Sequence, residues 1–178
     1  MTITPLSEEQ ESELHRLWQF YRKEARRCAK AKAHLGACVM KGAELETALI
    51  LMASAYTDEA AAVVSSRIAK KPLVNWTLNE LLQVAKTAGW LPAQLNLDED
   101  WDQLKANIGD YAEVVRKMRN LLHPSRYMKD QYRGKITKKY AKMAFEIIDV
   151  AYDHLDAHVN ESLRKHFQAQ KRSKKRKS

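Results

Sequence analysis

The sequence predicts an all-α protein, a bundle of five or six helices. Its 178 residues include only 5 glycines and 4 prolines, the residues that most often mark turns and loops. Apolar residues recur at spacings of three and four along most of the chain, and no stretch shows the alternation typical of strands between hairpin turns. With 45% hydrophobic residues, the chain can bury one sizeable core. Residues 1–170 are therefore expected to form a single α-helical domain.

The N-terminal part of the bundle is predicted from capping signals. Ser7 and Gln10 form a plausible capping box for a helix from about residue 8 to the low thirties, whose polar face is rich in Arg and Lys. A much more apolar helix is expected over residues 33–56. Because it has few polar positions, it is the predicted central helix.

Shorter helices follow the central one. Thr57 and Asp58 are the predicted cap of a helix that is expected to end near Ala69. Thr77 with Glu80 forms a capping box for the next helix, which closes at Gly89.

The C-terminal half is predicted to hold two longer helices. One begins at the acidic segment 98–102 and ends at His123, because the following Pro124 disfavours the α conformation at the residue before it. A loop then precedes the last helix, expected over residues 138–168.

The net charge of +9 is concentrated at the C-terminus. Residues 171–178 contribute six basic side chains and no acid, which leaves +3 for the rest of the chain. Such a run is expected to be a disordered basic tail, which either contacts phosphate nonspecifically or only aids solubility.

Compartment and cysteine usage give simple expectations. No apolar run approaches the roughly 20 residues that span a bilayer, and the N-terminus lacks the order of a signal peptide. The chain is therefore expected to be cytoplasmic, with no membrane partner.

Cys28 and Cys38 are ten residues apart within helical sequence, a spacing that is neither that of a metal-binding pair nor that of a redox motif.

The strongest candidate site is the stretch R-K-M-R-N-L-L-H at the end of the helix before Pro124. At about 100° per residue, Arg116, Arg119, Asn120 and His123 share one face, opposite an apolar face. The negative helix terminus favours a protonated imidazole. Cationic groups beside such an imidazole can bind phosphate and transfer a proton. An ordinary amphipathic helix with a solvated polar side would explain the same pattern.

Basic and aromatic residues continue after the proline. The predicted RNA-binding residues of this loop are Arg126, Tyr127, Lys129, Tyr132 and Arg133. Cations suit the phosphates of single-stranded RNA, and rings suit its exposed bases. The alternative is an exposed loop without function.

Two further groups of polar residues are candidates for a site. Glu46 lies in the apolar central helix, where a carboxylate needs a partner, so it is expected to support the site by pairing with an Arg of the motif; Glu44 is expected to be exposed. His154 and His158 have i, i+4 spacing but lack the Glu of H-E-x-x-H. Solvent-facing helix residues explain the pair, and no metal site is predicted.

The chain resembles the HEPN superfamily of small α-helical domains over roughly residues 33–127. The resemblance is carried by G-x-x-L-E at 42–46, by a capped helix ending L-L-Q-V-A-K-T-A-G-W-L at 81–91, and by the closing R-N-L-L-H-P at 119–124. In that family, four to six residues separate an Arg, usually followed by a polar residue, from a His. Arg119 has Asn120 after it but only three residues before His123, whereas Arg116 has six, so either can be the motif Arg.

The resemblance implies a metal-independent endoribonuclease without a cofactor, acting as a homodimer in which two Arg/His helices form one cleft. It also implies a toxin–antitoxin or phage-defence setting, with an antitoxin as a possible protein partner. The competing hypothesis is a non-catalytic helical module that dimerises or binds RNA or a nucleotide, because some HEPN-like members are inactive. A DNA-binding regulator ranks last, since no recognition helix with a tight turn is evident.

Overall fold

The computed structural model describes residues 2–92 and 138–175. These residues form six α-helices and one 3-10 helix, without a strand, so the all-α prediction is confirmed. The helices are α1 (Glu8–Lys30), α2 (His34–Ala55), α3 (Thr57–Val63), α4 (Ser66–Ala69), η1 (Leu73–Asn75), α5 (Leu78–Thr87) and α9 (Lys138–Lys175).

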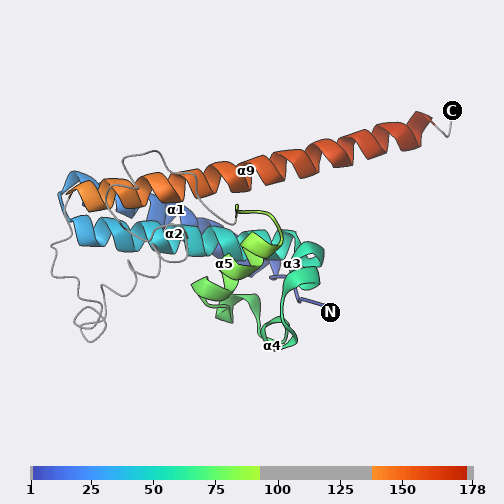
Figure 1. Ribbon diagram of the computed structural model, residues 1–178, viewed down its shortest axis with the longest axis horizontal. Coiled ribbons are helices and arrows are strands. Elements are labelled where there is room, and N and C mark those ends of the chain that lie inside the picture. Colours follow the sequence, from blue (N-terminus) through green and yellow to red (C-terminus); the bar gives the residue numbers. More distant parts are fainter. Residues whose placement is uncertain (1, 93–137, 176–178) are drawn as a thin grey trace.

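Three long helices form the frame of the molecule (Figure 1). The first two, α1 and α2, are antiparallel and packed along most of their length, and α9 lies beside them and runs in the same direction as α2. The close packing of α1 on α2 uses Gly36, where an added Cβ would lie 3.2 Å from Sγ of Cys28. The shorter helices α3, α4 and α5 gather around the C-terminal half of α2.

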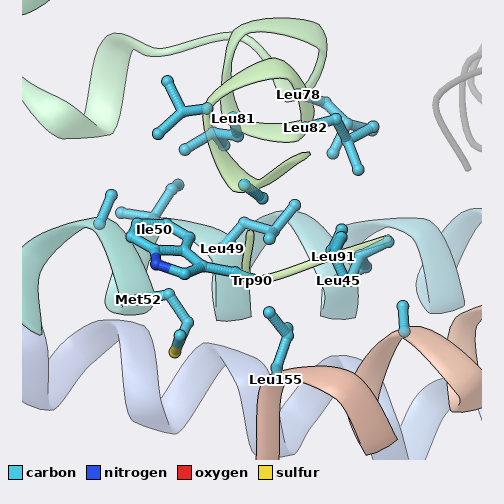
Figure 2. Packing of buried hydrophobic residues seen from close by; sticks show 14 of the residues in the cluster. Leu45, Leu49, Ile50, Met52, Leu78, Leu81, Leu82, Trp90, Leu91 and Leu155 are labelled. Atoms are coloured by element: carbon cyan, nitrogen blue, oxygen red, sulfur yellow. The ribbon is translucent and has the colours of Figure 1, made fainter. Parts of the chain in front are cut away.

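The hydrophobic core forms where α5 and the segment after it cover α2 (Figure 2). Leu45 and Leu49 of α2 are fully buried, and Trp90 is 2% exposed between α2 and α9. Leu155 completes this core from the α9 side. The apolar segment expected to be the central helix is therefore the central helix.

Side-chain caps fix two helix starts as predicted. Ser7 begins α1 with a capping box to Gln10, and Thr77 begins α5 with a capping box to Glu80. The Glu80 carboxylate also accepts a hydrogen bond from Lys71 Nζ at 2.6 Å. At the other end of α5, Gly89 has φ +79°, the left-handed conformation that glycine adopts most easily after a helix.

The helix expected to run from Thr57 to near Ala69 is two helices. Val64 has extended backbone angles and is buried in the core, so tertiary packing breaks the helix where the local pattern would continue it. The predicted cap is also wrong, because Tyr56 stands at the N-cap position and makes no side-chain capping bond.

The last helix is longer than predicted. It continues to Lys175, seven residues beyond the expected end at 168, and includes the first five residues of the segment expected to be disordered. This stretch has no Gly or Pro and consists mainly of Lys, Arg, Gln and Ala, which are good helix formers. The expectation of disorder is therefore corrected for residues 171–175.

We predict that Thr77→Ala lowers the free energy of unfolding by about 1 kcal/mol, the usual cost of removing an N-cap. The hydroxyl of Thr77 accepts from the backbone N–H of Glu80 at 3.3 Å and donates to its carboxylate at 3.0 Å. Urea denaturation measures the effect. Thr87→Ala, at the exposed C-terminal end of the same helix, is the matched control and should change stability by less than about 0.5 kcal/mol. Equal effects of the two substitutions would show that the cap does not stabilise α5.

Candidate functional site

In the sequence, the residues predicted to act on RNA come after α5 and before α9, outside the described residues. They are Arg116, Arg119, Asn120 and His123, with Arg126, Tyr127, Lys129, Tyr132 and Arg133. Their roles stay predictions. The other residues weighed as site residues, on α2 and α9, lie in the described part of the chain.

The carboxylate buried in α2 is Glu44, and the prediction that it would be exposed is wrong. Glu44 is 1% exposed, whereas Glu46 is partly exposed. The sequence of α2 is apolar on nearly every side of the helix, so the spacing of its apolar residues could not show which glutamate faces the other helices. The overlooked signal is Lys41, which precedes Glu44 by three residues, the spacing of an intrahelical ion pair.

A charge cluster of four side chains joins the three long helices: Arg22 of α1, Lys41 and Glu44 of α2, and Asp149 of α9. The Lys41 ammonium, only 7% exposed, lies 2.7 Å from Oδ1 of Asp149 and 3.1 Å from Oε2 of Glu44. This Glu44 oxygen is buried, and its geometry with Lys41 is not that of a hydrogen bond. The Arg22 guanidinium lies 3.8 Å from the other Glu44 oxygen. Lys41 and Glu44 are buried, whereas the side chains of Arg22 and Asp149 are 45% and 61% exposed. Two cations and two carboxylates thus compensate one another, with the buried pair at the centre.

Two aromatic rings of α9 lie beside the Lys41 ammonium. The Lys41 ammonium lies 5.4 Å from the ring centroid of Phe145 and 5.3 Å from that of Tyr152, which are favourable cation–π distances. Trp18 of α1 donates a hydrogen bond from Nε1 to Oη of Tyr152 at 3.0 Å. Burial raises the pKa of the Tyr152 phenol, and the Glu44 carboxylate raises it further. The phenol therefore stays protonated.

The charge cluster is a structural element. Because Glu44 and Lys41 are almost completely buried, a polynucleotide could not reach them. Their charges hold α1, α2 and α9 in one arrangement, since separating the helices would leave a buried charge without its partner. Burial raises the pKa of the Glu44 carboxyl, although Lys41 and Arg22 oppose that effect.

The two histidines of α9 differ from each other. His154 is exposed, as expected, but His158 is only 23% exposed and packs edge-on against Tyr56, with ring centroids 5.0 Å apart. Its Nε2 lies 3.1 Å from Oε2 of Glu59, and the same oxygen accepts a hydrogen bond from Trp90 Nε1 at 2.7 Å. The expectation of two solvent-facing histidines is corrected for His158, which links α9 to the α3 side of the core.

The described residues bring together no metal-binding cluster, and both of the cysteines are free. Within residues 2–92 and 138–175, no three His, Cys, Asp or Glu side chains come together in a way that could hold a metal ion. Burial raises the pKa of the Cys38 thiol to about 11, so this thiol is protonated at neutral pH and a poor nucleophile. Cys28 is partly exposed, and both cysteines are free.

The exposed side of α1 is basic from Arg16 onward, as the sequence indicated, whereas the first turns of the helix are acidic. Residues 16–32 contain one acid, Glu24. The exposed basic residues of this segment are Arg16, Arg22, Lys23, Arg26, Arg27, Lys30 and Lys32. Phe20, 52% exposed, lies among them. This surface, the α1 basic face, attracts polyanions by long-range electrostatics.

Comparisons of the chain with protein-family models, with curated proteins and with solved structures find no match. The likeness to HEPN domains therefore rests on the sequence motifs. In the described part of the chain, no helix has both the length and the apolar character needed to cross a bilayer.

We predict that Glu44→Gln changes how stability depends on pH. Because the raised pKa of Glu44 makes the folded chain bind this proton more tightly than the unfolded chain, its contribution to stability is largest at low pH. That contribution is lost as the pH rises from the ordinary glutamate pKa of about 4.3 through the raised folded value. The unfolding free energy of Glu44→Gln minus that of wild type should therefore increase with pH across this window, because wild type loses this contribution and the variant does not.

The control is Glu146→Gln, an exposed glutamate on α9 that pairs with Lys142. Its difference from wild type should lack a comparable rise. Urea denaturation at a series of pH values measures both differences. A Glu44→Gln difference that is flat or falls with pH would contradict the proposed effect of burial.

Proposed function

We propose that the chain is a HEPN-like, metal-independent endoribonuclease. The observation that carries the proposal is the sequence constellation of Arg116, Arg119, Asn120 and His123 on one face of a predicted helix. Two guanidiniums, an amide and an imidazole at a helix C-terminus can bind a phosphodiester and transfer a proton near neutral pH.

The proposed reaction is attack of a ribose 2′-oxygen on the adjacent phosphorus. The 2′-hydroxyl loses its proton, the new O–P bond forms, and the bond from phosphorus to the 5′-oxygen breaks. The leaving 5′-oxygen takes up a proton, so the products are a cyclic phosphate and a 5′-hydroxyl. In this scheme His123 transfers the proton, Arg116 or Arg119 stabilises negative charge on the phosphoryl oxygens, and Asn120 orients the phosphate or the imidazole ring.

Two features of the described residues support the proposal. The helical bundle agrees with the all-α fold that the HEPN resemblance implies. The α1 basic face would add electrostatic attraction for a polyanionic substrate, and the exposed ring of Phe20 within it could stack on a base. The proposal also includes the homodimer, the possible antitoxin and the toxin–antitoxin or phage-defence setting that the resemblance implies.

A non-catalytic module that dimerises or binds RNA or a nucleotide is the second candidate. One observation favours it: only three residues separate Arg119 from His123, whereas the family pattern has four to six. A shorter separation turns the two side chains to a different relative angle on the helix. The basic groups would still bind phosphate in such a module, but the proton transfer would be lost.

We predict that the purified chain cleaves single-stranded RNA in EDTA and that His123→Ala reduces the rate by at least about 100-fold, the usual contribution of a general acid or base. Arg116→Ala and Arg119→Ala identify the motif Arg, because the residue that stabilises the phosphoryl charge should cause the larger loss. The product ends should be a cyclic phosphate and a 5′-hydroxyl. Denaturing gel electrophoresis measures the rate, and phosphatase and kinase sensitivity identifies the ends.

His154→Ala is the matched control, because His154 is an exposed histidine on α9 and should leave the cleavage rate unchanged. Equal residual activity in wild type and His123→Ala would remove the catalytic assignment. RNA binding without cleavage by the wild-type chain would favour the non-catalytic module.

A further inference from the structure

The C-terminal half of α9 projects beyond the other helices (Figure 1). Apolar residues follow one another at four-residue spacing along this helix, and their exposure rises as it leaves the bundle. Leu155 is 3% exposed and Val159 is partly buried against the core, but Leu163 is 49% exposed and Phe167 is 58% exposed. An isolated helical segment of this length is only marginally stable in water. A partner that covers Leu163 and Phe167 would stabilise it.

Charge along α9 is divided between two segments. Residues 143–163 contain five acids and no Lys or Arg, whereas residues 164–175 contain six basic residues and no acid. Two parallel copies of this helix would place basic segment against basic segment. Two antiparallel copies would instead place each basic segment against residues of the other copy that include Asp156 and Glu161. Charge complementarity thus favours an antiparallel second copy of this chain.

We propose that two copies of the chain associate through an antiparallel pairing of the projecting ends of α9. Positions 156, 160, 163, 167, 170 and 174 follow the alternating spacing of four and three that forms a coiled-coil seam. A two-fold axis at position 165 places Leu163 of each copy opposite Phe167 of the other and position 160 opposite position 170. It also places Asp156 opposite position 174, which is a lysine in the sequence. The contact is isologous, so it closes as a dimer.

A polyanion fits this surface less well. The basic segment alone would attract nucleic acid, but the acidic residues Asp153 and Asp156 are exposed nearby on α9 and would repel it. Nucleic acid phosphates would also leave Leu163 and Phe167 in water. A second copy would bury Leu163 and Phe167 and would also bring the basic segment close to acidic residues. Because the apolar seam is short, the dimer is expected to be weak and to depend on protein concentration.

Disulfide cross-linking tests the pairing in the full-length chain, with Cys28 replaced by serine and nucleic acid removed by nuclease. In the antiparallel register, Asn160→Cys of one copy lies opposite Gln170→Cys of the other. In either single variant the two identical cysteines are about 15 Å apart along the helix axis, at 1.5 Å per residue, which is too far for a disulfide. The double variant should therefore form a covalent dimer in diamide much faster than either single variant.

Two further substitutions link the cross-link to the proposed contact. Leu163→Glu in the double variant should slow cross-linking about tenfold or more, because it removes apolar burial and adds repulsion. Val74→Glu, at a similarly exposed apolar position on η1, should leave the rate unchanged. Circular dichroism confirms that each variant folds.

The proposal is overturned if the double variant cross-links no faster than the single variants, or if Leu163→Glu has no effect on the rate. Fast cross-linking of either single variant would indicate a parallel pairing and would overturn it too. The pairing does not depend on the proposed ribonuclease activity. A His123→Ala chain should cross-link like the parent, so failure of cleavage and failure of pairing are separate results.

Discussion

The ammonium group of Lys41 is the constraint on which the arrangement of the long helices depends. It is almost completely buried and lies within 3.1 Å of carboxylate oxygens on both α2 and α9. A buried charge without partners costs several kcal/mol, so helix arrangements that separate Lys41 of α2 from Asp149 of α9 are disfavoured. Apolar packing against α2 could tolerate small shifts of α9 along its axis. The contact between Lys41 and Asp149 opposes such shifts.

The position of α9 bears on both proposals. Its first residue, Lys138, follows directly after the chain segment that holds the predicted catalytic and RNA-binding residues. Its C-terminal half, held in line by the same helix, leaves the bundle with Leu163 and Phe167 exposed. One well-anchored helix therefore follows, in the sequence, the segment proposed for RNA chemistry and carries the surface proposed for self-association.

Features that depend on local sequence were predictable, whereas features that depend on packing were not. Side-chain caps at Ser7 and Thr77 correctly marked helix starts, because they satisfy backbone N–H groups within one turn. The burial of Glu44 was not predictable, because it depends on which face of an apolar helix meets α1 and α9. The break at Val64 has the same origin. Of the candidate site, only Glu46 lies in the described residues, so the assignment of the Arg/His motif rests on sequence.

The most direct test of the Lys41 constraint is a double-mutant cycle with Lys41→Met, Asp149→Ala and the double substitution, measured as free energies of unfolding in urea at pH 7. We expect Lys41→Met alone to cost about 3 to 5 kcal/mol, because it leaves the buried Glu44 carboxylate without its nearest cation. The double substitution should cost less than the sum of the two single costs by at least about 1 kcal/mol. Small, additive costs for both substitutions would contradict the account.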